Sequence, residues 1–114
     1  MKKNENTAQQ YRTAQLWSVL VFAARHQEIV SYLMIERLTG IPRQGVSPYL
    51  NLIHEYCEDK QWPSLAVLAV NEATGKPGSK YWAKIDVLAA QSRVFAFDWL
   101  KDKAPSPQDF INSN

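Results

Sequence analysis

The sequence predicts a mainly α-helical fold with a small β wing: a winged helix-turn-helix, formed as one domain. Three observations support this class. Apolar residues recur at spacings of three and four from Ala8 to His26, the period of a helix face. Helix start and stop signals then divide residues 31–60 into two helices. Finally, a valine- and leucine-rich run precedes the turn-forming stretch NEATGKPG, as strand and tip of a wing would.

Composition and length favour one soluble domain. The chain has 114 residues, 46% of them hydrophobic and 21% charged, which is enough to bury a single core. Its one cysteine, Cys57, cannot form an internal disulfide, and the opening MKKNENTAQQ does not continue as a secretory signal. The apolar run from Leu16 to Ala24 is far shorter than the roughly 20 residues that span a bilayer. We therefore expect a cytoplasmic protein without a membrane segment.

The first elements are an arm and a packing helix. Residues 1–6 are polar and basic and predict a flexible N-terminal arm, ahead of a domain over 7–100. Thr7 can cap a helix over 8–26, whose predicted core positions are Tyr11, Ala14, Trp17, Leu20, Val21 and Ala24. The β-branched pair Ile29-Val30 is short enough to be a single edge bridge or the approach to the next helix.

The helix-turn-helix follows. Ser31 is a good N-cap for a short helix over 32–39, in which Leu33, Ile35 and Leu38 can point inward. Gly40 can take the left-handed conformation that ends it, and Pro42 stands near the start of the next helix, over 43–59. The buried face of that helix is predicted to hold Val46, Leu50, Ile53 and Cys57.

The last third predicts the wing, a final helix and a tail. Residues 65–70 suit a buried strand, 71–78 a hairpin tip and 79–84 a poor return strand. Asp86 can cap a helix over 87–100, with Leu88, Val94, Phe95 and Trp99 facing the core. Residues 101–114 contain two prolines and many polar side chains, and predict a flexible tail.

Motifs of catalysis and metal binding are missing from the sequence. The two histidines, His26 and His54, fall on different predicted helices, and Cys57 near His54 is expected on a buried face. There is no GxGxxG, GxxxxGK[ST], HExxH or GxSxG motif. We expect no metal, no cofactor and no enzymatic activity.

One stretch of the chain, about residues 30–78, resembles a known family. The order and spacing of its parts are similar to the DNA-binding domain of alkylguanine-DNA alkyltransferases and their alkyltransferase-like relatives, on the residues Val30-Ser31-Tyr32, Ile35, Gly40, Pro42, Trp62 to Val67, Val70 and Thr74-Gly75. The family's reactive motif, proline-cysteine-histidine-arginine-valine, is matched here by residues 63–67, PSLAV, without thiol, base or cation. The resemblance therefore implies DNA binding without alkyl transfer.

Further roles follow from the resemblance. The family uses a tyrosine at the start of the first helix of its helix-turn-helix to act on the target phosphate, and Tyr32 stands in that place. It also uses an arginine early in the second helix to fill the space left by a flipped base. Arg43, Gln44 and Val46 are three alternatives for that position, so the alignment leaves base flipping open.

Duplex DNA is the predicted partner. The first half of the second helix carries side chains that read base edges or hold phosphates, and lysines recur in the wing, which gives the candidate DNA-binding set Tyr32, Arg43, Gln44, Ser47, Asn51, Lys76 and Lys80. The net charge of +2 permits DNA binding without demanding it. The alternatives are a solvated helix face and a solubilising loop.

A second class of function competes with DNA binding. The same fold can serve as a protein-interaction module, an adaptor or inhibitor of the kind a phage or mobile element carries, because fold alone does not settle function. The acidic end of the second helix, with Glu55, Glu58 and Asp59, favours this alternative. A homodimer is also open, since the first or last helix could supply a symmetric apolar face.

Overall fold

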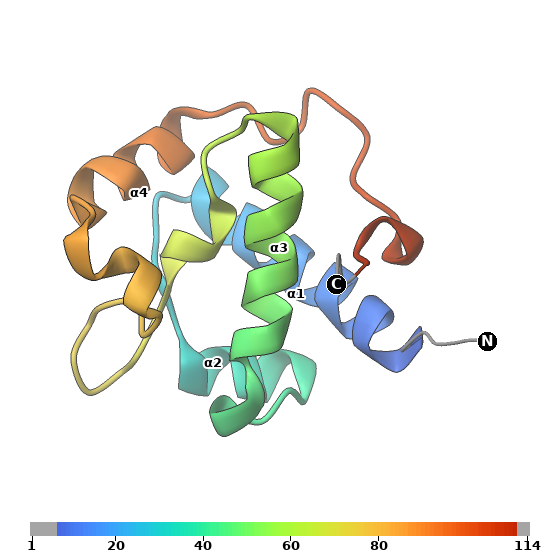
Figure 1. Cartoon of the computed structure of the whole chain (residues 1–114), viewed down its shortest axis with the longest axis horizontal. Coiled ribbons are helices and arrows are strands. Elements are labelled where there is room, and N and C mark those ends of the chain that lie inside the picture. The colour runs from blue at the N-terminus through green and yellow to red at the C-terminus, as the bar shows by residue number, and fades with distance from the viewer. Residues whose placement is uncertain (1–6, 112–114) are drawn as a thin grey trace.

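The computed structural model describes residues 7–111, which form one mainly helical, compact domain with a Cα radius of gyration of 13.4 Å. Within this part the α-helices are α1 (Thr7–Arg25), α2 (Tyr32–Thr39), α3 (Ser47–Lys60) and α4 (Val87–Ala96) (Figure 1). The predicted N-terminal arm, residues 1–6, lies outside the described residues.

Helix α1 runs through the middle of the fold and contributes much of the core. It lies behind α3 in Figure 1, and it packs against α2, α3, the 3-10 turn Leu65–Leu68 and the C-terminal segment. Leu16 and Leu20 are fully buried along this helix, whereas Tyr11, which we expected to face the core, is 54% exposed. The prediction for Tyr11 is wrong because the first turns of α1 bury a different face, on which Thr13 is 0% exposed.

A two-stranded parallel sheet joins the first and second halves of the chain. Strand β1 (Val30–Ser31) pairs with β2 (Ala69–Val70), with Val30 opposite Ala69 and Ser31 opposite Val70. Of the two alternatives for Ile29-Val30, the structure shows the bridge, and its partner is the end of the predicted buried strand. This pairing places the loop after β2 beside the start of α2.

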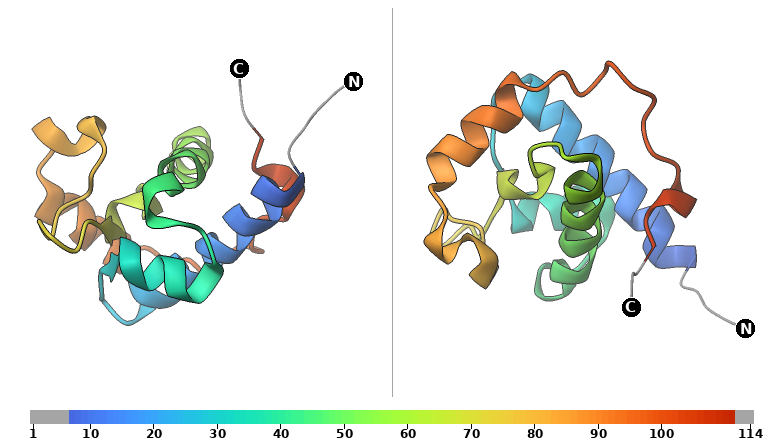
Figure 2. Two further views of the ribbon diagram at one scale, coloured as in Figure 1. Left: turned by 90° about the horizontal axis from the view of Figure 1, so that it is seen from below. Right: turned by 45° about the horizontal axis from the view of Figure 1, so that its top comes forward.

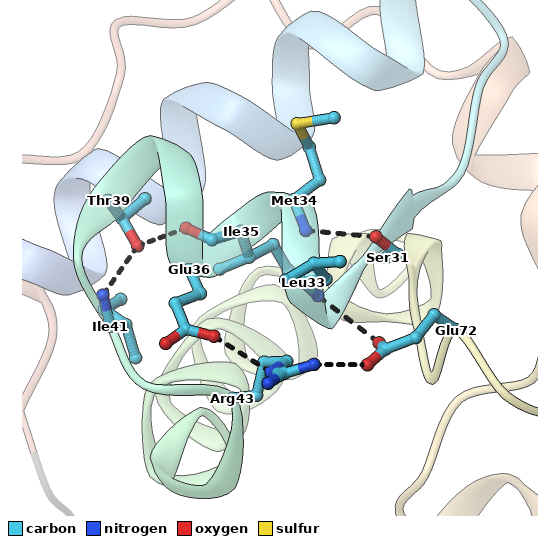
Figure 3. Close-up of polar contacts among 9 residues, drawn as sticks. All are labelled: Ser31, Leu33, Met34, Ile35, Glu36, Thr39, Ile41, Arg43 and Glu72. Atoms are coloured by element: carbon cyan, nitrogen blue, oxygen red, sulfur yellow. Dashed lines mark hydrogen bonds and ion pairs between the residues drawn. The ribbon is translucent and has the colours of Figure 1, made fainter.

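The caps and turn between α2 and α3 are confirmed. The Ser31 hydroxyl accepts a hydrogen bond from the Met34 amide at 3.0 Å, and Gly40 ends α2 with φ of 81° (Figure 3). A 3-10 turn, Arg43–Gly45, then precedes α3, so the predicted single helix over 43–59 is divided at Val46. Leu38, predicted to point inward, is 59% exposed because it lies on the outer face of α2.

The wing hairpin is not confirmed. Residues Leu65–Leu68 form a 3-10 turn before β2, and the predicted return strand is wrong because Lys80–Lys84 is also a 3-10 helix. The Ser79 hydroxyl accepts the Tyr81 amide at 3.1 Å and so caps a helical turn, and the Trp82 side chain is buried by that turn. The loop between β2 and this turn still projects at one side of the molecule (Figure 1).

Helix α4 begins as predicted and ends earlier. The Asp86 carboxylate accepts the Ala89 amide at 3.1 Å, which confirms the cap, but the helix stops at Ala96 instead of Leu100. Trp99 still reaches the core, where its indole donates to the Val94 carbonyl at 2.8 Å. Leu88 was expected in the core and is 77% exposed, because α4 buries the opposite face, around Val94.

The C-terminal segment contradicts the predicted flexible tail as far as residue 111. A 3-10 turn, Pro107–Asp109, lies beside α1 in both views of Figure 2, and the following Phe110 is 1% exposed. Its ring packs 5.8 Å from Trp17 and 5.5 Å from Tyr56, between centroids. The polar composition of residues 101–114 predicted a flexible tail and gave no sign that the apolar side chain of Phe110 packs into the core. Residues 112–114 lie outside the described residues.

Candidate nucleic-acid interface

A small hollow brings together residues from four parts of the chain. It has a volume of about 40 Å³ and is lined from α2 by Tyr32, from α3 by Ser47, Leu50, Asn51 and His54, from residues 66 and 69, and from the later loop and turn by Pro77, Gly78, Ser79, Tyr81 and Trp82. Three residues of the predicted DNA-binding set, Tyr32, Ser47 and Asn51, therefore meet at one place.

A hydrogen bond across the hollow ties α2 to the loop after β2. The Tyr32 hydroxyl accepts the Gly78 amide at 2.8 Å, although the two residues are 46 positions apart. A Cβ at position 78 would lie 2.9 Å from that hydroxyl oxygen, closer than real Cβ atoms come. A side chain at position 78 would therefore displace the Tyr32 hydroxyl, whereas glycine lets the two segments approach and the hydrogen bond form.

The loop itself is closed by Asn71. Its backbone amide donates to the Lys76 carbonyl at 2.9 Å, its carbonyl accepts the Gly75 amide at 2.7 Å, and its side-chain oxygen accepts the Ala73 amide at 2.7 Å. Gly75 has φ of 71°, which favours glycine. These bonds hold a compact turn from which the exposed Lys76 projects.

Arg43 lies outside the hollow and is paired with two carboxylates (Figure 3). Its Nε is 2.9 Å from Glu36 Oε1, and its Nη1 is 3.1 Å from Glu72 Oε2. The second oxygen of Glu72 accepts the Leu33 amide at 3.3 Å. Arg43, expected as a DNA contact, is thus the centre of a bridge between α2 and the loop, with 42% of its side chain exposed.

The bridge is one of several contacts that lower the pKa of Glu72. Its pKa is lowered first by a hydrogen bond from its own backbone amide, and further by Arg43 and the Leu33 amide, with desolvation opposing them. The carboxylate is therefore charged at neutral pH and pairs with Arg43.

The remaining predicted contacts lie near the hollow without lining it. Gln44 is exposed in the 3-10 turn before α3. Lys76 and Lys80 are exposed and line a separate groove of about 710 Å³, between the loop and the start of α4. The structure therefore divides the predicted set into three residues at the hollow, two lysines along the groove, the paired Arg43 and the exposed Gln44.

His54 and Ser64 form a contact that sequence reasoning missed. His54 Nδ1 lies 2.8 Å from Ser64 Oγ, and its Nε2 lies 3.8 Å from Glu58 Oε2. The imidazole packs against Tyr81, with ring centroids 4.5 Å apart. No sequence motif predicts this contact, because ten residues and a helix end separate His54 from Ser64.

The chemistry of this group favours a structural role. A nucleophilic serine needs a base that a third group orients closely, whereas Glu58 is 59% exposed and beyond hydrogen-bond distance. Ser64 does not line the hollow beside His54. The hydrogen bond instead joins α3 to the segment before β2.

Cys57 is buried, as its predicted place on the apolar face of α3 requires. Burial raises the pKa of its thiol to about 12, so the thiol stays protonated at neutral pH and is a poor nucleophile. Across residues 7–111 there is no group of three or more metal-ligating side chains placed to hold an ion.

Comparisons with models of protein families, with curated proteins and with solved structures find no significant match for this chain. Among the described residues, none of the helices has both the length and the apolar character needed to span a membrane.

Proposed function

We propose that this protein is a non-catalytic binder of duplex DNA that uses the start of α3 and the lysine-bearing loop after β2. The observation that carries the proposal is the hollow in which Tyr32, Ser47 and Asn51 meet the Gly78 segment. Polar side chains on the first half of the second helix, next to a basic loop, match the parts that helix-turn-helix proteins present to a major groove and its phosphates.

The proposed DNA contacts fall into two groups according to the chemistry of their side chains. Gln44, Ser47 and Asn51 are exposed and carry the amide and hydroxyl groups that read base edges. Lys76 and Lys80 are exposed cations that neutralise phosphates, which contributes sequence-independent affinity. Since Arg43 is shared by two carboxylates, the lysines supply most of the positive charge of this surface.

A salt titration with labelled duplexes tests the proposal. We expect affinity to fall as salt rises, and Lys76→Ala and Lys80→Ala each to reduce the slope of log K against log salt by about 0.9. Asn51→Ala should change the preference among sequences with little effect on the slope. Lys101→Ala, which removes an exposed lysine near the C-terminus, is the matched control and should change neither. A protein without salt-dependent affinity for mixed duplexes at low salt would contradict DNA binding.

A protein-interaction function is the second candidate, and one groove favours it. The groove that Lys76 and Lys80 line also holds Ile85 and Leu88, which are 37% and 77% exposed, and it is lined by no carboxylate. Apolar side chains flanked by lysines suit an acidic amphipathic segment of another protein.

Leu88→Ser separates the two functions. The lysines would contact either partner, but an exposed leucine contributes to a protein interface and contributes little to phosphate contacts. Unchanged DNA affinity in Leu88→Ser, with losses in both lysine variants, supports the DNA proposal. Lysine variants without effect on DNA would favour the protein-interaction function.

A further inference from the structure

A band of exposed apolar side chains crosses the C-terminal half of α1. At its centre Phe22 is 67% exposed, and the rest of the band is formed by Ile29, Met34, Leu38 and Leu100, which are 46%, 49%, 59% and 62% exposed. Phe22 lines one hollow with Leu100 and another with Ile29, Met34 and Leu38, and apolar surface joined in this way marks an interaction site. Met34 projects away from the Arg43 bridge (Figure 3). The hollow that Met34 lines adjoins the proposed DNA surface at Asn71, Glu72 and Gly75 of the loop after β2.

Two hollows lie along this band, and Phe22 belongs to both. One, of about 420 Å³, has ten lining residues, among them Trp17 and Leu100. The other, of about 640 Å³, has thirteen, among them Ile29, Met34 and Leu38. Together they involve about as many residues as one side of a standard protein interface, roughly 20–30.

The charged side chains of the two hollows differ. Arg25 and His26 line the first hollow, where Asp102 is the opposing carboxylate. Glu28 and Glu72 line the second, and because Glu72 is already paired with Arg43, Glu28 is the carboxylate that Arg25 of a second copy would face. A two-fold axis near Phe22 would exchange the hollows between two copies, and would bring the cation-bearing end of each copy against the acidic end of the other.

We propose that the Phe22 band is the interface of a symmetric homodimer. Each Phe22 is covered by the partner's copy of the band, and Arg25 of one chain faces the acidic hollow of the other. The rim carries both signs of charge, which suits a self-complementary surface better than a partner of one sign. This inference does not depend on DNA binding and is tested without DNA.

Sedimentation equilibrium of the whole chain, from about 1 μM to about 500 μM, tests the interface. We expect a monomer–dimer equilibrium in which Phe22→Ser raises the dissociation constant at least tenfold. Leu88→Ser is the matched control, because it removes an apolar side chain that is more exposed and lies outside the band. Arg25→Glu should weaken the dimer, and Arg25→Lys should preserve it.

The outcomes are distinct. Dissociation by Phe22→Ser and Arg25→Glu, with Leu88→Ser unchanged and circular dichroism identical throughout, supports the proposal. A monomer over the whole range overturns it and leaves the band to another partner. A dimer that survives Phe22→Ser overturns it as well, because the interface must then lie elsewhere. Since DNA affinity is measured separately, its loss or presence affects none of these results.

Discussion

Two carboxylates, from α2 and from the loop after β2, share the guanidinium of Arg43. Because Glu36 and Glu72 both lie within 3.1 Å of its nitrogens, little positive field remains for a phosphate. The same bridge links the helix that starts at Tyr32 to the loop that carries Lys76. Arg43 therefore holds α2 and the loop together and contributes little positive charge to the proposed DNA surface.

Replacing Glu72 with glutamine should strengthen DNA binding severalfold. The substitution removes a negative charge beside the proposed phosphate contacts and releases one end of Arg43. Affinity at fixed salt is the measurement. Asp59→Asn, which removes the same charge at the far end of α3, is the control and should have a smaller effect. In an Arg43→Ala background the gain should shrink, and an undiminished gain would contradict the role of the bridge.

Cys57 makes stability depend on pH in the alkaline range. Its folded pKa of about 12 lies above the ordinary value of 9.0, so the folded state keeps its thiol proton where the unfolded state has lost it. The stabilisation is therefore complete below about pH 9 and is lost as the pH rises toward 12, at about 1.4 kcal/mol per pH unit. Urea unfolding between pH 8 and pH 10.5 measures this slope, and Cys57→Val should lessen it. Equal slopes in the two proteins would contradict the assignment.

At the scale of elements, local sequence signals were enough to predict where α2 and α4 begin and where α2 ends. Ser31, Gly40 and Asp86 each act within three or four residues, so their caps and turn were predictable from neighbours in the chain. The segment over 80–84 was not, because an aromatic pair and an alanine between two lysines fit a short strand as well as a 3-10 turn. Ser79 as a cap is the signal that could have identified it.

The C-terminal segment supplies an element-scale prediction. Phe110 is 1% exposed between Trp17 and Tyr56, so Phe110→Ala should lower the free energy of unfolding by about 3–5 kcal/mol. The neighbouring Ile111 is 64% exposed, and Ile111→Ala should change stability by less than about 0.5 kcal/mol. Thermal or urea unfolding measures both. Equal stability of the two variants would show that the segment does not contribute to the core.

At the scale of the whole molecule, the two proposed surfaces lie mainly on different elements and adjoin at the loop after β2. The hollow lies between α3 and the loop that follows β2, and the Phe22 band runs over α1, β1 and α2. The parallel pairing of β1 with β2 is what brings the start of α2 beside that loop. A dimer formed through the band would therefore leave two hollows free to bind DNA.

The sequence by itself determined the helical class, the caps at Ser31, Gly40 and Asp86, and the burial of Cys57. These depend on spacing and on interactions between near neighbours. Tertiary structure alone decided that Arg43 is paired, that Tyr32 meets Gly78, that Phe110 is an anchor and that Leu88 is exposed. Each of these depends on contacts with residues distant in the sequence or on which face of a helix is packed against another element. The spacing of hydrophobic residues does not predict such contacts or such packing.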